Sequence, residues 1–131
     1  MIVGIGVDLI ETMRVKKIFN TWGDKFLKKI LSTNEHQKFV NYQYEQSYDK
    51  QINFLAKRFA AKEAIGKALG FGMQNPVKFQ SIEISNNKNG QPYPIFYNQL
   101  KIYCEEKRYT FHLSISDQRS LAQAFAVVEV F

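Results

Sequence analysis

Apolar residues follow two different periods along the chain, and the period predicts which segments form strands and which form helices. The short apolar or alternating runs that are typical of strands are Ile2–Leu9, Phe79–Ile84, Thr110–Ser116 and Ala122–Val130. Polar turn residues predict a hairpin at Asn86–Gly90 and a turn at Asp117–Ser120 between the last two strands. Because the first strand ends near Asp8, an acidic side chain lies at the end of an apolar segment.

Helical spacing covers most of the remaining chain, and Ile52–Leu69 is the strongest example, with Gly70 as its C-cap. The other expected helices are Thr12–Lys29 with a break near Gly23, a short helix through Tyr42 capped by Thr33 or Asn34, and Asn98–Lys107. Local hairpins and separate helices indicate an α+β fold, in which a small antiparallel sheet packs against one long helix plus short helices. No linker or repeat divides residues 1–131, so we expect a single domain.

Composition narrows the class of protein. Apolar residues make up 45% of the 131 residues, and 11 Phe and 7 Tyr supply large surfaces for a core. The net charge of +6 favours anionic partners: phosphorylated ligands, acidic proteins, nucleic acid or anionic membranes. Much of it is concentrated between Thr12 and Ile30, where six basic residues accompany one acidic residue.

The sequence lacks a pair of cysteines and lacks a membrane or signal segment, and both features bear on the expected cellular compartment. Cys104 is the single cysteine, so no intrachain disulfide forms, which suits a reducing compartment. We expect Cys104 to be a small, partly buried apolar residue and not a nucleophile. No segment has the length of a transmembrane helix, and the apolar N-terminus lacks the basic region of a signal peptide.

The helix Ile52–Leu69 presents two unlike sides when its residues are placed 100° apart. One flank consists of small or aliphatic residues and predicts close packing on a sheet: Ala60, Ala61, Ala64, Ile65 and Ala68. The opposite side combines one carboxylate with cations and glycines: Lys62, Glu63, Gly66, Lys67 and Gly70, with Arg58 at its edge. A solvated face with an ion pair between Glu63 and Lys67 would explain part of this pattern. Gly66, however, costs about 1 kcal/mol relative to Ala in a helix interior, which indicates that something approaches the backbone there.

One acid among several cations suits a metal-bound polyphosphate, because Mg²⁺ binds one or two carboxylates together with phosphate oxygens and water. Asp8 is the natural second carboxylate, since an acid at the end of an apolar strand is costly unless it is paired or bound to metal. Its alternative role is to cap the segment that starts near Glu11. His112 lies in a predicted strand, either as a half-buried histidine or as a donor to an anionic ligand. No Cys or His cluster has zinc spacing, and Gly4-Ile5-Gly6 lacks the spacing of a dinucleotide-binding motif.

Four segments together resemble the holo-acyl-carrier-protein synthase family, which are phosphopantetheinyl transferases. They are GIGVDLIE at 4–11, RFAAKEAIGKALGFG at 58–72, SIEI and NGQP within 81–92, and HLSISD at 112–117. The resemblance covers essentially the whole chain. It implies an enzyme of fatty acid biosynthesis that transfers 4′-phosphopantetheine from coenzyme A to a serine of apo-acyl carrier protein and releases adenosine 3′,5′-bisphosphate. It also implies a cytoplasmic, Mg²⁺-dependent homotrimer with active sites between subunits.

The resemblance also implies roles for individual residues. Asp8 and Glu63 would be the metal ligands, and Glu63 and Lys67 the catalytic residues. The implied contacts to coenzyme A are Arg58, Lys62, Gly66, Lys67 and His112. Arg14 would meet the acidic carrier protein, and Glu63 would take the serine proton directly or through a metal-bound water.

The chain departs from the family at a few positions. Many members have Thr or Ser at the position of Phe71, and several have Ser or Ala at that of Gly66. The basic pair common before the main helix is reduced to Lys50 near Asp49, which leaves the contacts to the 3′-phosphate open. The competing hypothesis is a basic, aromatic-rich module that binds single-stranded nucleic acid. It explains the charge and the aromatic content, but it explains neither Asp8 nor an acid placed among cations beside glycines.

Overall fold

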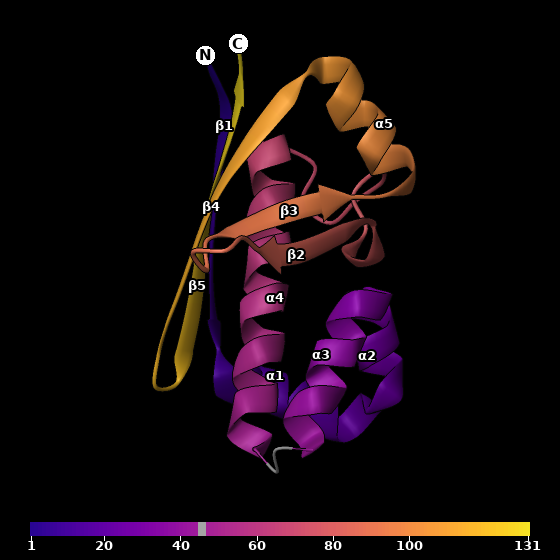
Figure 1. The fold of residues 1–131 in the computed structure, drawn as a ribbon, viewed down its shortest axis with the longest axis vertical. Helices are drawn as coiled ribbons and strands as arrows, with labels where there is room; N and C mark the ends of the chain where they lie inside the picture. Colours follow the sequence, from indigo (N-terminus) through magenta and orange to yellow (C-terminus); the bar gives the residue numbers. More distant parts are fainter. Residues whose placement is uncertain (45–46) are drawn as a thin grey trace.

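Two antiparallel sheets organise the protein, for which a computed structural model describes residues 1–44 and 47–131 (Figure 1). The main sheet has the strand order β1-β5-β4 and consists of β1 (Ile2–Glu11), β5 (Leu121–Val130) and β4 (Tyr109–Gln118). The second sheet pairs β2 (Ile82–Asn86) with β3 (Pro92–Phe96). Both chain ends lie at one end of the main sheet, where the Met1 ammonium group donates to the carbonyl of Val130 at 2.7 Å.

Helix α4 (Tyr48–Leu69) is the central element (Figure 1). It packs along β1 and β5, and it also contacts β2 of the second sheet. The remaining helices are α1 (Thr12–Trp22), α2 (Asp24–Ile30), α3 (Thr33–Tyr44) and α5 (Asn98–Lys107), with a short 3-10 turn, η1 (Phe79–Ser81). The predicted α+β fold, with a small antiparallel sheet against one long helix, is confirmed. In the described part of the chain, no helix is both long enough and apolar enough to cross a membrane.

Two glycines allow β1 to approach α4 very closely. A Cβ atom on Gly4 would lie 2.0 Å from the carbonyl oxygen of Ala68, and one on Gly6 would lie 2.0 Å from that of Ala64. The predicted flank of small residues on α4 is accordingly buried against the sheet. This contact holds Asp8, two residues beyond Gly6, against the side of α4.

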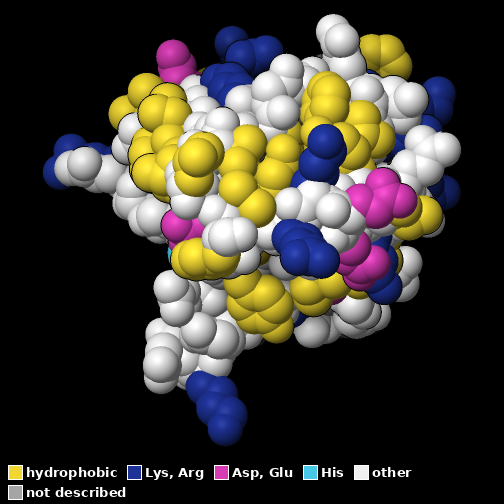
Figure 2. Space-filling view, turned by 90° about the horizontal axis from the view of Figure 1, so that it is seen from above, with side chains coloured by type: hydrophobic (Ala, Val, Ile, Leu, Met, Phe, Trp, Pro, Cys, Tyr) yellow, Lys and Arg dark blue, Asp and Glu magenta, His cyan; other side chains and the backbone are white. Residues whose placement is uncertain are grey.

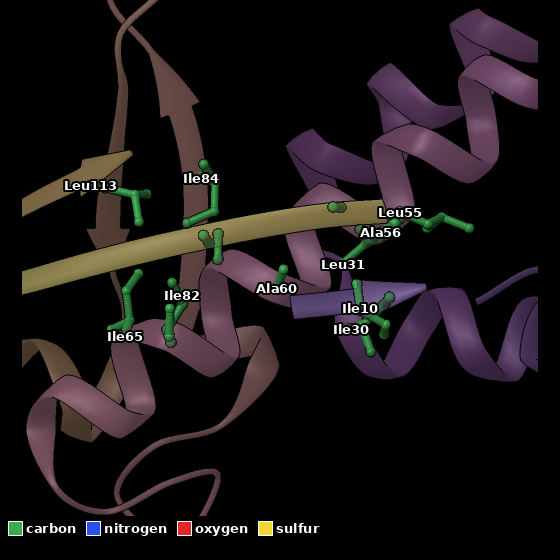
Figure 3. Packing of buried hydrophobic residues seen from close by; sticks show 14 of the residues in the cluster. Ile10, Ile30, Leu31, Leu55, Ala56, Ala60, Ile65, Ile82, Ile84 and Leu113 are labelled. Atoms are coloured by element: carbon green, nitrogen blue, oxygen red, sulfur yellow. The ribbon is translucent and has the colours of Figure 1, made fainter. Parts of the chain in front are cut away.

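The hydrophobic core holds α4 on its other sides (Figure 3). Ile65 of α4 meets Ile82 and Ile84 of β2 and Leu113 of β4, and all four side chains are buried. A second part of the core, around Leu55, brings α1 and α3 against α4, while α2 packs against α1 and η1. Because it is packed from several directions, α4 is a rigid support for the polar side chains that it carries.

Several element boundaries differ from the sequence prediction. Strands β1 and β4 each end two residues later than expected, at Glu11 and Gln118. Helix α4 begins at Tyr48 and not at Ile52, because the Ser47 hydroxyl caps it and accepts a hydrogen bond from the Lys50 amide at 3.3 Å. The segment Phe79–Ser81 forms η1 and is not the start of a strand; β2 begins only after it.

The cap of α3 also differs from the prediction of Thr33 or Asn34. The Ser32 hydroxyl accepts from the Glu35 amide at 3.2 Å, and the Ser32 amide donates to the Glu35 carboxylate at 2.9 Å. This reciprocal pair is a capping box, in which the two residues satisfy each other's backbone amides. It places the Glu35 carboxylate at the buried start of α3, where it faces α4.

Candidate active site

Asp8 and Lys67 meet where β1 passes the C-terminal half of α4. The Lys67 ammonium donates to Asp8 Oδ1 at 3.1 Å and to the carbonyl of Val7 at 2.9 Å. The Asp8 side chain is 15% exposed and that of Lys67 is 49% exposed. The carboxylate is therefore oriented by the lysine and still reachable from solvent.

Glu63 lies one helical turn before Lys67 and completes the cluster. The pKa of Glu63 is raised, mainly because burial disfavours its charged form and next because the Asp8 carboxylate is near. The positive charges of Lys67 and Arg14 oppose this shift. Four predicted site residues, from β1, α1 and α4, therefore act on one another electrostatically.

The donor set of this cluster suits Mg²⁺. Within residues 1–44 and 47–131, no group of three or more His, Cys, Asp or Glu residues is arranged to hold a metal ion. Two carboxylates alone do not form a closed site, but Mg²⁺ commonly binds one or two carboxylates and keeps places for phosphate oxygens and water. Asp8 and Glu63 fit that requirement, while Lys67 and Arg14 add the positive charge that a phosphate needs.

Lys62 does not belong to this open face, although the sequence analysis placed it there beside Glu63 and Lys67. Its side chain is 0% exposed and its ammonium lies 2.6 Å from Glu35 Oε1. The same ammonium donates to the carbonyls of Ile30 at 2.5 Å and Phe79 at 3.1 Å. All three of its protons are therefore used inside the protein, which leaves none for a phosphate.

Arg58 is also largely buried, but it reaches a surface hollow. The hollow has a volume of about 550 Å³ and includes four basic residues in its lining: Lys38, Lys50, Lys57 and Arg58. Asp117 also lines it, 3.9 Å from the Lys57 ammonium. This concentration of cations suits an anionic ligand.

Gly66 has a structural explanation that replaces the predicted contact with coenzyme A. A Cβ atom at this position would lie 2.3 Å from the carbonyl oxygen of Gly72, and the Gly66 carbonyl accepts hydrogen bonds from the amides of Phe71 and Gly72. Something does approach the backbone here, as the sequence indicated, but it is the chain's own return loop. Gly66 is buried by that loop.

His112 lies on the opposite face of the main sheet from Asp8. Asp8 is paired with Ala124 and His112 with Val127, and residues an odd number apart on β5 point to opposite faces. The exposed His112 ring lies 2.6 Å from Glu129 Oε1. Within one chain the structure therefore does not bring His112 together with Asp8 and Glu63.

Cys104 is buried, as expected, and burial raises its pKa to about 11. A thiol with this pKa is almost entirely protonated near neutral pH and is a poor nucleophile. Cys104 is therefore not a candidate for the chemistry of this site.

Comparison with known proteins identifies the family. A model described as the 4′-phosphopantetheinyl transferase superfamily matches residues 4–127. The chain belongs to this superfamily. It is similar to the holo-[acyl-carrier-protein] synthase of Buchnera aphidicola subsp. Acyrthosiphon pisum (strain Tuc7), with 43% identity over 129 residues that cover 98% of each chain.

Two solved structures extend the comparison to the fold. The holo-[acyl-carrier-protein] synthase from Neisseria meningitidis has a TM-score of 0.89 and 36% identity, over 99% of this chain and 100% of that one. A holo-(acyl-carrier-protein) synthase from Bacillus anthracis str. Ames, in complex with CoA (3′,5′-ADP), has a TM-score of 0.80 and 37% identity, over 98% of this chain and 96% of that one. The family resemblance seen in the sequence is confirmed.

Sequence reasoning missed the residues that surround Arg58 and Lys62. Glu35 is the most important, since it is 1% exposed and binds Lys62 directly. The spacing Ser32-Thr33-Asn34-Glu35 is the pattern of a capping box and would have placed Glu35 at the start of α3. No local pattern, however, reveals that α3 packs with this end against Lys62.

Proposed function

We propose that this protein transfers 4′-phosphopantetheine from coenzyme A to a serine of apo-acyl carrier protein, as a holo-[acyl-carrier-protein] synthase in fatty acid biosynthesis. The observation that carries the proposal is the convergence of Asp8, Glu63 and Lys67 at one open edge of α4 in a chain of this superfamily. The names of the relatives and the bound CoA (3′,5′-ADP) of the Bacillus anthracis protein support the same substrates. Residues 1–131 would act as one transferase domain.

The reaction needs charge neutralisation and alignment more than covalent chemistry. A bond forms between the serine oxygen and the phosphorus next to pantetheine, while the bond from that phosphorus to the bridging oxygen of the pyrophosphate breaks. Adenosine 3′,5′-bisphosphate leaves with the electron pair. Glu63, whose pKa is raised by burial and by Asp8, accepts the serine proton. Lys67 orients Asp8 and adds fixed positive charge beside the leaving group.

Asp8 and Glu63 would also hold Mg²⁺. When bound, this ion would supply positive charge to the pyrophosphate oxygens. The half-buried setting of both carboxylates supports this role, because acids in such places are stabilised by a cation. The raised pKa of Glu63 indicates that its own neighbours stabilise its charge incompletely.

We place the adenosine bisphosphate part of coenzyme A in the basic hollow at Arg58. Its cations would pair with the phosphates, as in other anion sites rich in arginine and lysine. Lys62 and Gly66 are not part of this proposal, because both are enclosed by the protein itself.

The positions of these groups support a site shared between chains. Arg58 precedes Glu63 by five residues, which is about 140° around the helix, so the hollow and the carboxylates open to different sides. His112 faces away from Asp8 across the sheet. A neighbouring copy would supply Arg58 and His112 to the Asp8 and Glu63 of the first chain.

The outer face of the main sheet supports a homotrimer. It exposes large apolar side chains that a monomer has no reason to present to water, with Ile5 at 60%, Val7 at 47%, Leu9 at 59% and Phe125 at 44% exposure. The end of the sheet that carries both termini continues this surface, and Figure 2 looks down on that end and shows hydrophobic side chains over much of it. A closed ring would cover this face in every copy.

The first helices would bind the carrier protein. Arg14 is exposed and close enough to influence Glu63, so a partner held there would present its serine to the site. An apolar hollow of about 380 Å³ between the helices is lined by Trp22, Phe26 and Phe59 and flanked by Lys25 and Lys29. An acidic helix with one apolar side chain matches this combination.

The nucleic-acid hypothesis receives less support. Phe26, Phe39 and Phe54 are buried, and further aromatic rings pack on one another, as in the pairs Phe59–Phe79 and Phe96–Phe111. Rings engaged in a core do not form a platform on which bases stack.

The deciding experiment incubates the protein with apo-acyl carrier protein, coenzyme A and Mg²⁺, and follows the carrier by intact mass spectrometry. We expect the carrier to gain one phosphopantetheine and adenosine 3′,5′-bisphosphate to appear in equal amount, with no product when EDTA is present. Salt-sensitive binding of RNA without any modification of the carrier would refute the proposal. Fractionation of cells should find the enzyme in the cytoplasm, where it would meet both substrates.

A further inference from the structure

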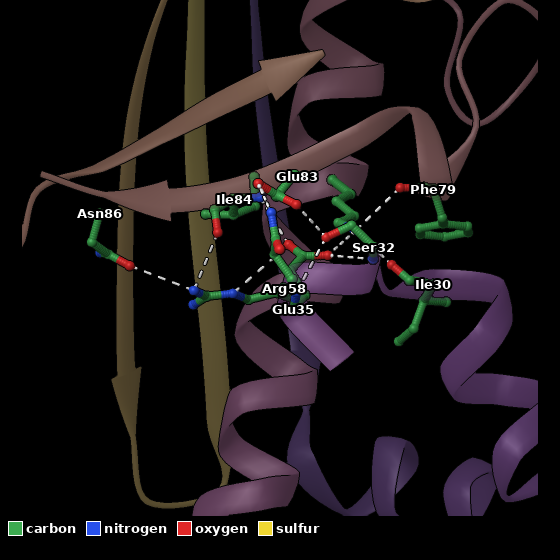
Figure 4. A network of polar contacts seen from close by, with 10 residues as sticks. Ile30, Ser32, Glu35, Arg58, Phe79, Glu83, Ile84 and Asn86 are labelled. Carbon is green, nitrogen blue, oxygen red and sulfur yellow. Dashed lines mark hydrogen bonds and ion pairs between the residues drawn. The ribbon is translucent and has the colours of Figure 1, made fainter. Parts of the chain in front are cut away.

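Glu35 lies at the centre of a buried polar network that joins α3, α4 and β2 (Figure 4). Its Oε1 accepts hydrogen bonds from the Lys62 ammonium at 2.6 Å and from the Ser32 amide at 2.9 Å. Its Oε2 accepts from the Ile84 amide at 2.8 Å and lies 3.9 Å from Arg58 Nε. The carboxylate is therefore fixed by three bonds and directed toward the one guanidinium that lines the basic hollow.

Arg58 is held much less tightly than Glu35. Its Nη2 donates to the carbonyl of Ile84 at 3.3 Å and to Asn86 Oδ1 at 3.5 Å, both long bonds. Its Nε is buried and has no hydrogen-bond partner among the described residues. The ring of Phe54 lies under the guanidinium at 4.4 Å. Since its hydrogen bonds are weak, the charge of the fixed Glu35 carboxylate contributes strongly to where the guanidinium lies.

We infer that Glu35 is a positioning residue for the binding of coenzyme A. Its carboxylate holds Arg58 at the wall of the basic hollow, and Lys62 balances the rest of the carboxylate's negative charge. The inference rests on the proposed function, because it takes the hollow as the place where the adenosine bisphosphate phosphates bind. Glu35 does not touch the ligand and acts only through Arg58.

The role can be tested by whether Glu35→Gln tightens or weakens the binding of adenosine 3′,5′-bisphosphate. If Glu35 acted only through its charge, Glu35→Gln would tighten binding, because a negative charge near an anion site would be lost. If Glu35 positions Arg58, the same change should weaken binding about tenfold, because the guanidinium loses the fixed negative charge that lies 3.9 Å from its Nε. Glu35→Asp keeps the charge but withdraws it by one methylene, and it should also weaken binding.

Isothermal titration calorimetry with adenosine 3′,5′-bisphosphate, on the whole protein and its variants, measures this effect. Glu83→Gln is the matched control, because Glu83 is 5% exposed in the same network but bonds Ser32 and Asn34. We expect it to lower the unfolding midpoint without changing nucleotide affinity. In steady-state assays Glu35→Gln should raise KM for coenzyme A and leave KM for the carrier protein unchanged, a split that a general loss of stability would not produce.

Two outcomes overturn different statements. Unchanged or tighter nucleotide binding by both folded Glu35 variants would refute the positioning role and leave the proposed function intact. A wild-type protein that does not bind the nucleotide would refute the placement of coenzyme A in the hollow, and the inference with it.

Discussion

Lys62 and Glu63 are neighbours in the sequence but belong to two very different regions of the molecule. Lys62 lies in an ionic network in which every charged side chain is buried: Glu35, Arg58, Lys62 and Glu83. Arg58 is the member that also reaches the basic hollow. We call it the closed network because Lys62 itself is fully enclosed and fully paired. Glu63 lies in an open cluster, in which the Asp8 side chain is 15% and that of Lys67 is 49% exposed. Both regions contain two carboxylates and at least one lysine.

The difference shows that a cation in a functional motif is not evidence of a ligand contact. In the closed network two anions balance two cations, and every proton of Lys62 is bound by the protein. In the open cluster two carboxylates lie close enough for one to raise the pKa of the other, so a further cation would stabilise the site. Burial with full pairing stabilises the fold, whereas incomplete pairing at a solvent-accessible edge is what allows a metal or phosphate to bind.

The largest expected effect comes from breaking the open cluster. Asp8→Ala and Glu63→Ala should each lower kcat on the order of 10³-fold, because each removes charge that the transition state needs. Both variants should keep the wild-type circular dichroism spectrum. Intact-mass labelling of the carrier measures the loss, and Glu105→Ala, an exposed acid on α5, is the control. Near-normal turnover in either variant would refute the assignment.

The closed network lies entirely within one chain. A second experiment tests whether the active site at the open cluster needs His112 from a neighbouring chain. Glu63→Ala chains and His112→Ala chains, each impaired alone, should recover activity when co-expressed, because mixed trimers contain one interface with both wild-type residues. Native mass spectrometry confirms that mixed trimers form. Background activity in verified mixed trimers, or full turnover by a monomer in sedimentation, would contradict the shared site.

Substitution of Lys62 should mainly reduce stability, whereas substitution of Lys67 should mainly reduce turnover. Lys62→Met leaves Glu35 short of a buried partner and should lower the free energy of unfolding by roughly 3–5 kcal/mol. Lys67→Met removes a half-exposed pair and should cost less than about 1 kcal/mol. Urea titration measures both. Per folded molecule, Lys67→Met should lose more turnover than Lys62→Met, and the reverse order would remove the distinction between the two regions.

A variant of Arg14 tests whether the open edge of the site binds the carrier protein. Arg14→Glu should raise KM for the carrier protein roughly 30-fold, since exposed charge pairs contribute up to about 1 kcal/mol each and the change spans two charges. KM for coenzyme A should change little. The dependence of the rate on salt should weaken as well. Lys101→Glu on α5 is the control, and equal effects on both substrates would rule out a docking role.

The smallest effect concerns the pKa of Glu63, which is raised in the folded chain by burial and by Asp8. Between the unfolded and folded pKa values the folded state binds more protons, so this group makes stability fall as pH rises. Glu63→Gln removes that cost. The stability of the variant relative to wild type should therefore increase from pH 4 to pH 7.5 in urea titrations. Glu105→Gln corrects for the loss of a surface charge, and a constant difference across pH would contradict the raised pKa.

Much of the fold followed from local pattern. The apolar run at Ile2–Leu9, the small-residue flank of α4 and the turns at Gly70 and Asn86–Gly90 predicted the elements and their packing, because each depends on neighbours close in sequence. The boundary at Tyr48 was missed because its signal was a single capping serine. The start of β2 was missed because η1 has the same apolar pattern as a strand.

For the site, the sequence by itself determined that one helix carries an acid among cations, that the first strand carries Asp8, and that both belong to this family. It was wrong that this strand ends near Asp8, because β1 continues to Glu11. The sequence could not show that Lys62 is enclosed and Lys67 is accessible, because the two lysines differ only in which element packs against them. Only the tertiary structure decided that α3 brings Glu35 to Lys62, that a return loop covers Gly66, and that β1 leaves Lys67 beside Asp8. The physical reason is that the environment of a charge is set by residues distant in sequence, and that environment determines whether the charge stabilises the fold or remains available for a ligand.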